Sequence, residues 1–154
     1  MTTPRIEYIA VNIAAVIDEI TVANEFNQTL VAVRPKRNDF ADVVPENGKV
    51  LVVQQTAARD DSEGFGTAQW TQRFILMALV IDSDDATTSI DTRHNQVASD
   101  IAKKLNVDIT RGEYAFDTRI MESAIFDDGE GFTGIAVAVD VSYRTSETDP
   151  YSAG

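Results

Sequence analysis

The sequence predicts an α+β domain in which a mostly antiparallel sheet of about five strands packs with two helices. Two segments, one at the start and one in the middle of the chain, place apolar residues at helical spacing. Five other segments are rich in valine, isoleucine or aromatic residues, as strands are. The resulting order, α-β-β-β-α-β-β, groups strands around helices instead of alternating with them, which is typical of α+β proteins.

The first helix is predicted by an apolar stripe near the N-terminus. Apolar residues recur three or four positions apart with polar residues between them, and Pro4 favours a helix start just before them. This pattern indicates an amphipathic helix of roughly five turns. The stripe consists of Ile6, Ile9, Ile13, Val16, Ile17 and Ile20.

Two strands and a polar connection follow. Residues 30–33 predict a short strand that stops before Pro35, because proline cannot donate to a sheet ladder. Residues 49–55 predict a second strand after the Asn47-Gly48 turn signal. Residues 57–66 are charged and glycine-containing, and we expect a long polar loop of the kind that often carries function.

The middle of the chain predicts a central strand and the second helix. The second half of residues 69–81 is apolar on both faces, as in a strand covered on each side. The acidic segment 82–85 follows, and we expect it to cap a helix that ends near Leu105. Two lysines, Lys103 and Lys104, occupy the last turn, where they complement the helix dipole.

The chain ends with a predicted hairpin and a polar tail. Residues 115–126 and 132–143 resemble strands, and the acidic, glycine-rich segment between them is a turn signal. In the last strand Val137, Val139 and Val141 alternate with small or polar residues, so one face belongs to the core. We expect one domain over residues 1–154 with a fraying tail at 145–154.

Charge is the most informative bulk property of the sequence. The 154 residues include 25 acidic and 13 basic side chains, a net charge of −12. Such a surface repels phosphate backbones and disfavours conventional DNA or RNA binding. The acidic surface either serves solubility alone or lines a passage through which a polyanion moves without being bound.

Other bulk features exclude several classes. The absence of cysteine rules out disulfides and thiolate metal sites. We find neither a signal-peptide pattern nor an apolar run near the ~20 residues that span a bilayer, so we expect a soluble chain with no membrane partner, made in the cytoplasm.

No set of catalytic residues can be assembled from this sequence, and we expect a protein that is not an enzyme and needs no cofactor. The single histidine, His94, lies on the apolar stripe of the second helix without a second ligand nearby, which indicates a structural role. The acidic residues of 82–85 lack the glycine and glutamate of a calcium loop. We therefore predict no metal site.

Two sets of residues are candidates for function through assembly. Acidic loop residues could line a bore or merely solvate loops, and aromatic residues at element edges suit either core packing or subunit interfaces. The candidate bore or loop carboxylates are Asp60, Asp61, Glu63, Asp127, Asp128 and Glu130. The candidate interface aromatics are Phe65, Trp70, Phe132 and Tyr151.

The whole-chain order resembles the tail terminator, or tail completion, proteins of long-tailed bacteriophages. The resemblance rests on the opening helix, the valine-rich strand 49–55, the strand 70–81, the helix ending Ala102-Lys103-Lys104-Leu105, the closing strand at 140–144, and the Asp149-Pro150-Tyr151 ending.

The resemblance implies a structural virion protein, assembled in the host cytoplasm, that forms a homo-oligomeric ring, typically a hexamer. Such a ring caps the tail tube, stops its polymerisation and joins the tail to the head connector, or neck, protein, while DNA passes through the bore without specific binding. A head–tail connector or tail-tube subunit is the alternative in the same particle. A small metal- or ligand-binding domain is the alternative of another class.

Overall fold

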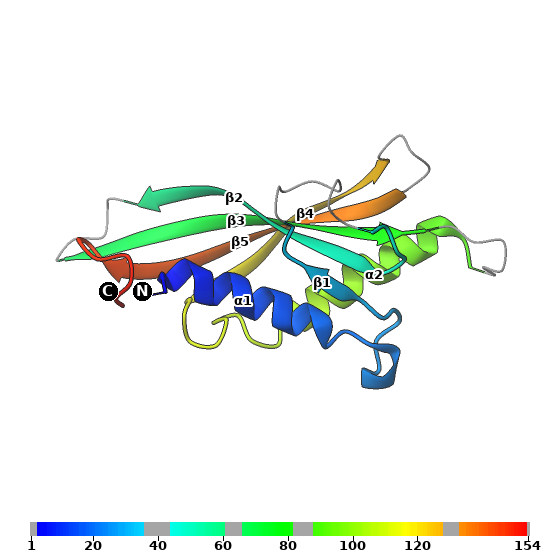
Figure 1. Cartoon of the computed structure of the whole chain (residues 1–154), viewed down its shortest axis with the longest axis horizontal. Coiled ribbons are helices and arrows are strands. Elements are labelled where there is room, and N and C mark those ends of the chain that lie inside the picture. Colours follow the sequence, from blue (N-terminus) through cyan, green and yellow to red (C-terminus); the bar gives the residue numbers. More distant parts are fainter. Residues whose placement is uncertain (1–2, 36–43, 61–65, 82–87, 128–132, 154) are drawn as a thin grey trace.

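The computed structural model describes residues 3–35, 44–60, 66–81, 88–127 and 133–153. It confirms the α+β class, with two helices and a mostly antiparallel sheet of five strands (Figure 1). A short 3-10 turn, η1 (Val22–Asn24), follows the first helix. The elements are α1 (Arg5–Asp18), β1 (Val31–Val33), β2 (Lys49–Asp60), β3 (Thr67–Val80), α2 (Ile90–Leu105), β4 (Asp117–Asp127) and β5 (Thr133–Ser146).

The sheet has the strand order β1-β2-β3-β5-β4. The short β1 runs parallel to β2, and all other neighbours are antiparallel. β3 pairs along its whole length with β5, from Thr67↔Ser146 to Val80↔Thr133, and on its other side with β2. The strand predicted at 69–81 is therefore the centre of the sheet, and the predicted closing hairpin is β4–β5.

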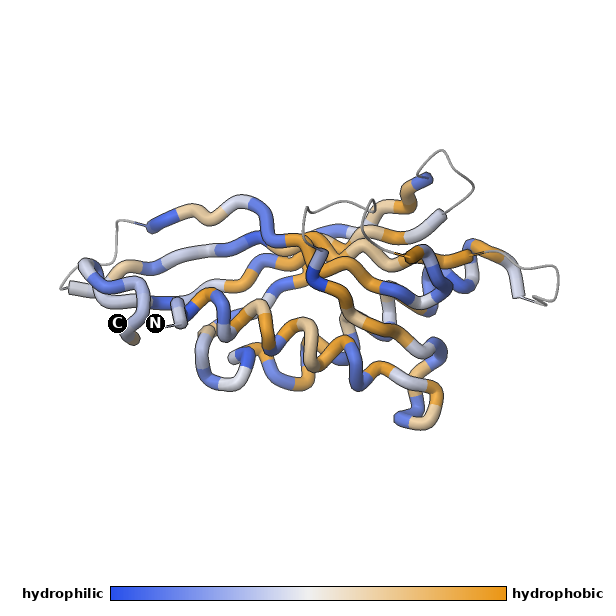
Figure 2. Tube along the Cα trace, viewed as in Figure 1, coloured by the Kyte–Doolittle hydropathy of each residue, from blue (hydrophilic) through white to orange (hydrophobic). Residues whose placement is uncertain are grey.

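Both helices lie on the same face of the sheet (Figure 1). Figure 2 shows the apolar residues gathered along the middle of the strands and on the helix sides that meet them. Ile13 of α1 and Ile101 of α2 have no exposed surface, and neither has Phe74 of β3. Burial of each side chain of this kind contributes about 1.5–3 kcal/mol, so the periodic stripes read from the sequence supply the core.

The helix ends differ from the sequence-based expectation. α1 spans 14 residues and ends at Asp18, because the chain turns at Glu19. Ile20 is buried all the same, just beyond the helix. The N-cap of α2 is Ser89, whose hydroxyl oxygen accepts from the Thr92 N–H at 3.3 Å. The expectation that the acidic segment 82–85 caps this helix was wrong, because the helix begins only at Ile90; residues 82–87 are outside the described part of the chain.

Two strands are longer than the sequence indicated. β2 continues to Asp60, so 57–60, the first part of the predicted loop 57–66, is strand paired with β3. β5 continues to Ser146, so the tail predicted from 145 begins later, and Thr145 is buried. Two backbone hydrogen bonds hold the segment after β5 against the fold. The Ser146 N–H donates to the Ser152 carbonyl oxygen at 3.1 Å, and the Arg5 N–H donates to the Pro150 carbonyl oxygen at 3.3 Å.

Candidate assembly surface

The described members of the two acidic clusters predicted from the sequence, Asp60 and Asp127, lie far apart. Asp60 is the last residue of β2 and is paired with Gln69 of β3. Asp127 is the last residue of β4 and is paired with Thr133 of β5, which in turn is paired with Val80 of β3. Gln69 and Val80 are eleven positions apart in one strand, which corresponds to about 36 Å. The structure thus places Asp60 and Asp127 at opposite ends of the sheet. The other members of the two clusters, Asp61, Glu63, Asp128 and Glu130, are outside the described residues.

The aromatic candidates do not form one patch. Trp70 is half-buried against the core on the helix side of β3, and its Nε1–H donates to Thr145 Oγ1 at 3.2 Å. The guanidinium of Arg59 lies 5.8 Å from its ring centre. Tyr151 lies in the C-terminal turn and is 46% exposed. Phe65 and Phe132 are not among the residues that the structure describes. Of the two placed aromatics, Tyr151 is the more accessible to a partner.

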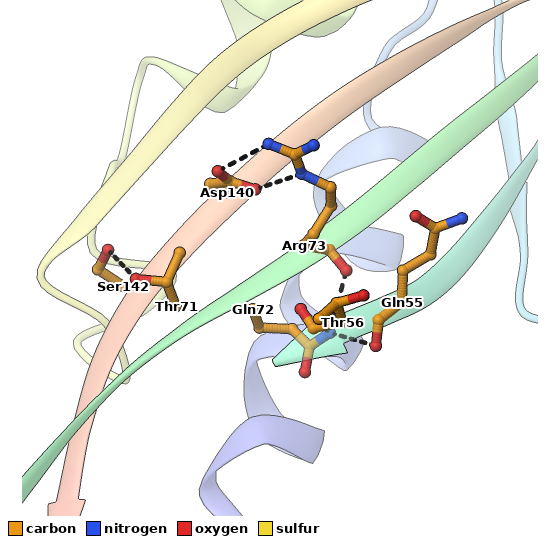
Figure 3. A network of polar contacts seen from close by, with 7 residues as sticks. All are labelled: Gln55, Thr56, Thr71, Gln72, Arg73, Asp140 and Ser142. Atoms are coloured by element: carbon orange, nitrogen blue, oxygen red, sulfur yellow. Dashed lines mark hydrogen bonds and ion pairs between the residues drawn. The ribbon is translucent and has the colours of Figure 1, made fainter. Parts of the chain in front are cut away.

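A surface that the sequence did not reveal is the sheet face turned away from the helices, called here the helix-free face. Its centre is an ion pair between Arg73 of β3 and Asp140 of β5, with N–O distances of 2.8 and 3.1 Å (Figure 3). The bond to Asp140 raises the pKa of the Arg73 guanidinium. Beside it, the Thr71 and Ser142 hydroxyls are 3.3 Å apart.

A β-bulge shapes this face where β2 passes the ion pair. The register of β2 against β3 shifts between Gln54 and Ala57. The buried amide of Gln72 fixes the shift, because its Nε2–H donates to the Gln55 and Thr56 carbonyl oxygens at 3.0 and 3.3 Å (Figure 3). Bulges of this kind bend a strand and re-aim its side chains. Here the bulge borders an open cavity of about 400 Å³ lined by Gln55, Thr56, Ala58, Thr71, Arg73 and Asp140.

The rest of the helix-free face is partly apolar and close to neutral. Leu51 and Val53 are buried there, with Val33, Ile75 and Met77 half-buried against them. Strand register assigns three basic and three acidic side chains of β3, β5 and β4 to this face. They are Arg73, Arg119, Arg144, Asp117, Glu122 and Asp140. Their formal charges cancel, in contrast to the chain's net −12. A neutral, mixed surface of this kind suits contact with another protein.

The structure places His94 inside the fold. Its side chain is buried on α2, with Nε2 3.4 Å from the Thr133 hydroxyl, and burial lowers its pKa. Within the described ranges, no group of three or more histidine, aspartate or glutamate side chains is arranged to hold a metal ion. None of the described helices has the length and apolar character needed to cross a bilayer.

Comparison with known proteins assigns no family. No protein-family model matches the sequence, and a search of curated proteins finds no match.

Proposed function

We propose that this chain is a structural virion protein, a tail terminator subunit that forms a ring, caps the tail tube and joins it to the head connector. The observation that carries the proposal is the one-sided cover of the sheet, which leaves a neutral, mixed face beside an otherwise acidic surface. A subunit that must contact copies of itself needs such a surface, and a ring closes through two different surfaces of each copy.

The strand arrangement supports an assembly role in a second way. Hairpins β2–β3 and β4–β5 extend from the helix-covered body toward opposite ends of the molecule (Figure 1). Met121 and Ile125, on the edge strand β4, are 47% and 58% exposed. Large apolar side chains on an unpaired edge favour contact with another protein surface. The proposal includes no catalytic step and no cofactor.

Electron microscopy of particles assembled with and without the chain tests the proposal. A terminator that stops tube growth predicts tubes of uncontrolled length and free heads when it is missing. Tails of normal length with unattached heads would instead identify a neck protein. Absence of any tube would identify a tube subunit, and normal particles would refute a virion role. The mass of assembled tails should give several copies per particle, with six as the expected number; a single copy would refute the ring.

A further inference from the structure

The two ends of the described chain lie side by side near the end of β5 (Figure 1). Residues next to both ends line a second cavity, called here the corner pocket. It has a volume of about 160 Å³. β4 begins at Asp117, which is paired with Ser142 of β5, whereas β5 continues to Ser146. The last residues of β5 therefore have no β4 residue beside them. The start of α1, the segment before β4, the end of β5 and the C-terminal turn enclose this space. The lining residues are Arg5, Tyr114, Ala115, Phe116, Arg144 and Ala153.

Both arginines of the corner pocket are held against aromatic rings. The guanidinium carbon of Arg144 lies 4.2 Å from the ring centre of Phe116, and that of Arg5 lies 5.5 Å from the ring centre of Tyr114. The Nε–H and Nη2–H groups of Arg5 donate to the carbonyl oxygens of Tyr114 and Glu113, each at 3.1 Å. Tyr114 in turn stacks on Tyr8 at 4.7 Å. The cations are therefore oriented before any ligand arrives.

Neither arginine pairs with a carboxylate within the ranges that the structure describes. Arg34, Arg73 and Arg119 each form an ion pair with an acidic residue, whereas Arg5 and Arg144 form none. A guanidinium has five N–H donors, so both side chains keep donors for another group. In a chain with 25 acidic and 13 basic residues, two cations without acidic partners at one cavity mark an anion site.

We propose that the corner pocket binds a carboxylate and that, in the assembly, it receives an acidic side chain from a second copy of this chain. The choice of a second copy rests on the proposed ring. Each copy carries an excess of acidic side chains, so the pocket of one copy and the acidic surface of the next are complementary in charge. Contact between two different surfaces is the head-to-tail type that closes a ring. Nucleic acid is the weaker candidate, because its phosphate chain would meet the net charge of −12.

The carboxylate site can be tested on the wild-type chain by NMR of the arginine Nε–Hε groups. Titration with N-acetylglutamate methylamide should shift the Arg5 and Arg144 signals to saturation, while the glutamine analogue, which has nearly the same shape without the charge, should not. Arg144→Gln should weaken binding at least tenfold. Lys103→Gln is the matched control, because Lys103 is an exposed cation that lies over the ring of Phe26, as Arg144 lies over Phe116, and it is neither in the pocket nor on the helix-free face. Equal shifts with acid and amide would overturn the proposal, as would tighter binding of inorganic phosphate.

Sedimentation of the same variants tests the source of the carboxylate. Arg144→Gln should weaken self-association at least tenfold and Lys103→Gln should leave it unchanged. Equal loss in both variants, or no loss in either, would reject the second copy as the ligand. A wild-type chain that binds the glutamate analogue but never self-associates, alone or on tail tubes, would reject the ring and keep the carboxylate site. A wild-type chain that assembles without binding the analogue would reject the site and keep the ring.

Discussion

Gly134 lies at a close approach between β5 and β3, and we predict that Gly134→Ala destabilises the fold through lack of space alone. A Cβ atom at this position would lie 2.2 Å from the carbonyl oxygen of Ala78 and 2.5 Å from Cζ of Phe126. The φ angle of Gly134 is outside the left-handed region, so alanine meets no conformational barrier there. Non-bonded carbon atoms need about 3.5 Å, so the strands must separate by about 1 Å.

The size of the stability loss depends on which atoms must move to make room for the added Cβ. Overpacking a well-packed site costs about 1–3 kcal/mol, and the upper end applies because a backbone oxygen of the paired strand cannot rotate away. A loss of about 3 kcal/mol lowers the Tm of a chain of this size by about 6–12 °C. Urea unfolding with an unchanged m-value and a thermal melt followed by circular dichroism measure the two quantities.

Gly66→Ala is the matched control. Its φ is +81°, but no atom lies within 4 Å of the added Cβ, so the cost is conformational only and amounts to about 1–2 kcal/mol. A stability of Gly134→Ala within about 0.5 kcal/mol of the wild type, the usual range of a neutral surface change, would refute a steric clash at this position. Equal losses of stability in the two variants would refute it as well.

Three further changes test other parts of the structure. Ser89→Ala removes the N-cap of α2 and should lower the free energy of unfolding by about 1 kcal/mol in urea titrations; no loss would show that another group caps the helix. Burial lowers the pKa of His94 from 6.5, so the unfolded chain binds this proton more readily. The stability from neutral His94 is present above about pH 6.5 and is lost as the pH falls through the lowered folded pKa; His94→Leu should flatten that part of the profile, and an unchanged slope would contradict the argument. Gln72→Leu removes the donor to two bulge carbonyls and should cost about 1–2 kcal/mol while raising amide exchange at 54–58; unchanged protection would show that the bulge does not depend on this amide.

The sequence predicts the core elements well because the buried residues of a helix or strand recur with the period of that element. Three of the four isoleucines of α1 and the alternating valines of β5 are fully buried. The extension of β2 shows no such pattern, because 57–60 reads Ala-Ala-Arg-Asp, which has little strand propensity. Pairing with β3 decides its conformation instead. The cap of α2 was misassigned because aspartates are strong caps, and spacing alone does not tell them from the serine directly before Ile90.

The candidate surfaces were not predictable in the same way. Arg73 and Asp140 are separated by 67 positions, and Arg5 and Tyr114 by 109. No local pattern links such residues; only the sheet register and the docking of α1 bring them together. Gln54, Gln55 and Thr56 directly follow the apolar part of β2, and the bulge lies among them, but polar residues alone do not predict a bulge. The acidic site candidates were predicted loop residues, and the structure separates their two described members, Asp60 and Asp127, by the length of the sheet.

The separation of Asp60 and Asp127 limits how their charge can act on DNA in the proposed ring. If the long axis of the sheet runs along the bore, both Asp60 and Asp127 can line it at different heights. If the axis is radial, only one of them faces DNA. Asp60→Lys and Asp127→Lys in separate particles distinguish the cases, because a lysine facing DNA should slow genome ejection in low salt and lose this effect in high salt. Slowing by both variants indicates the axial arrangement and slowing by one the radial arrangement. Normal ejection in both would show that neither position acts on DNA and that their charge serves solubility.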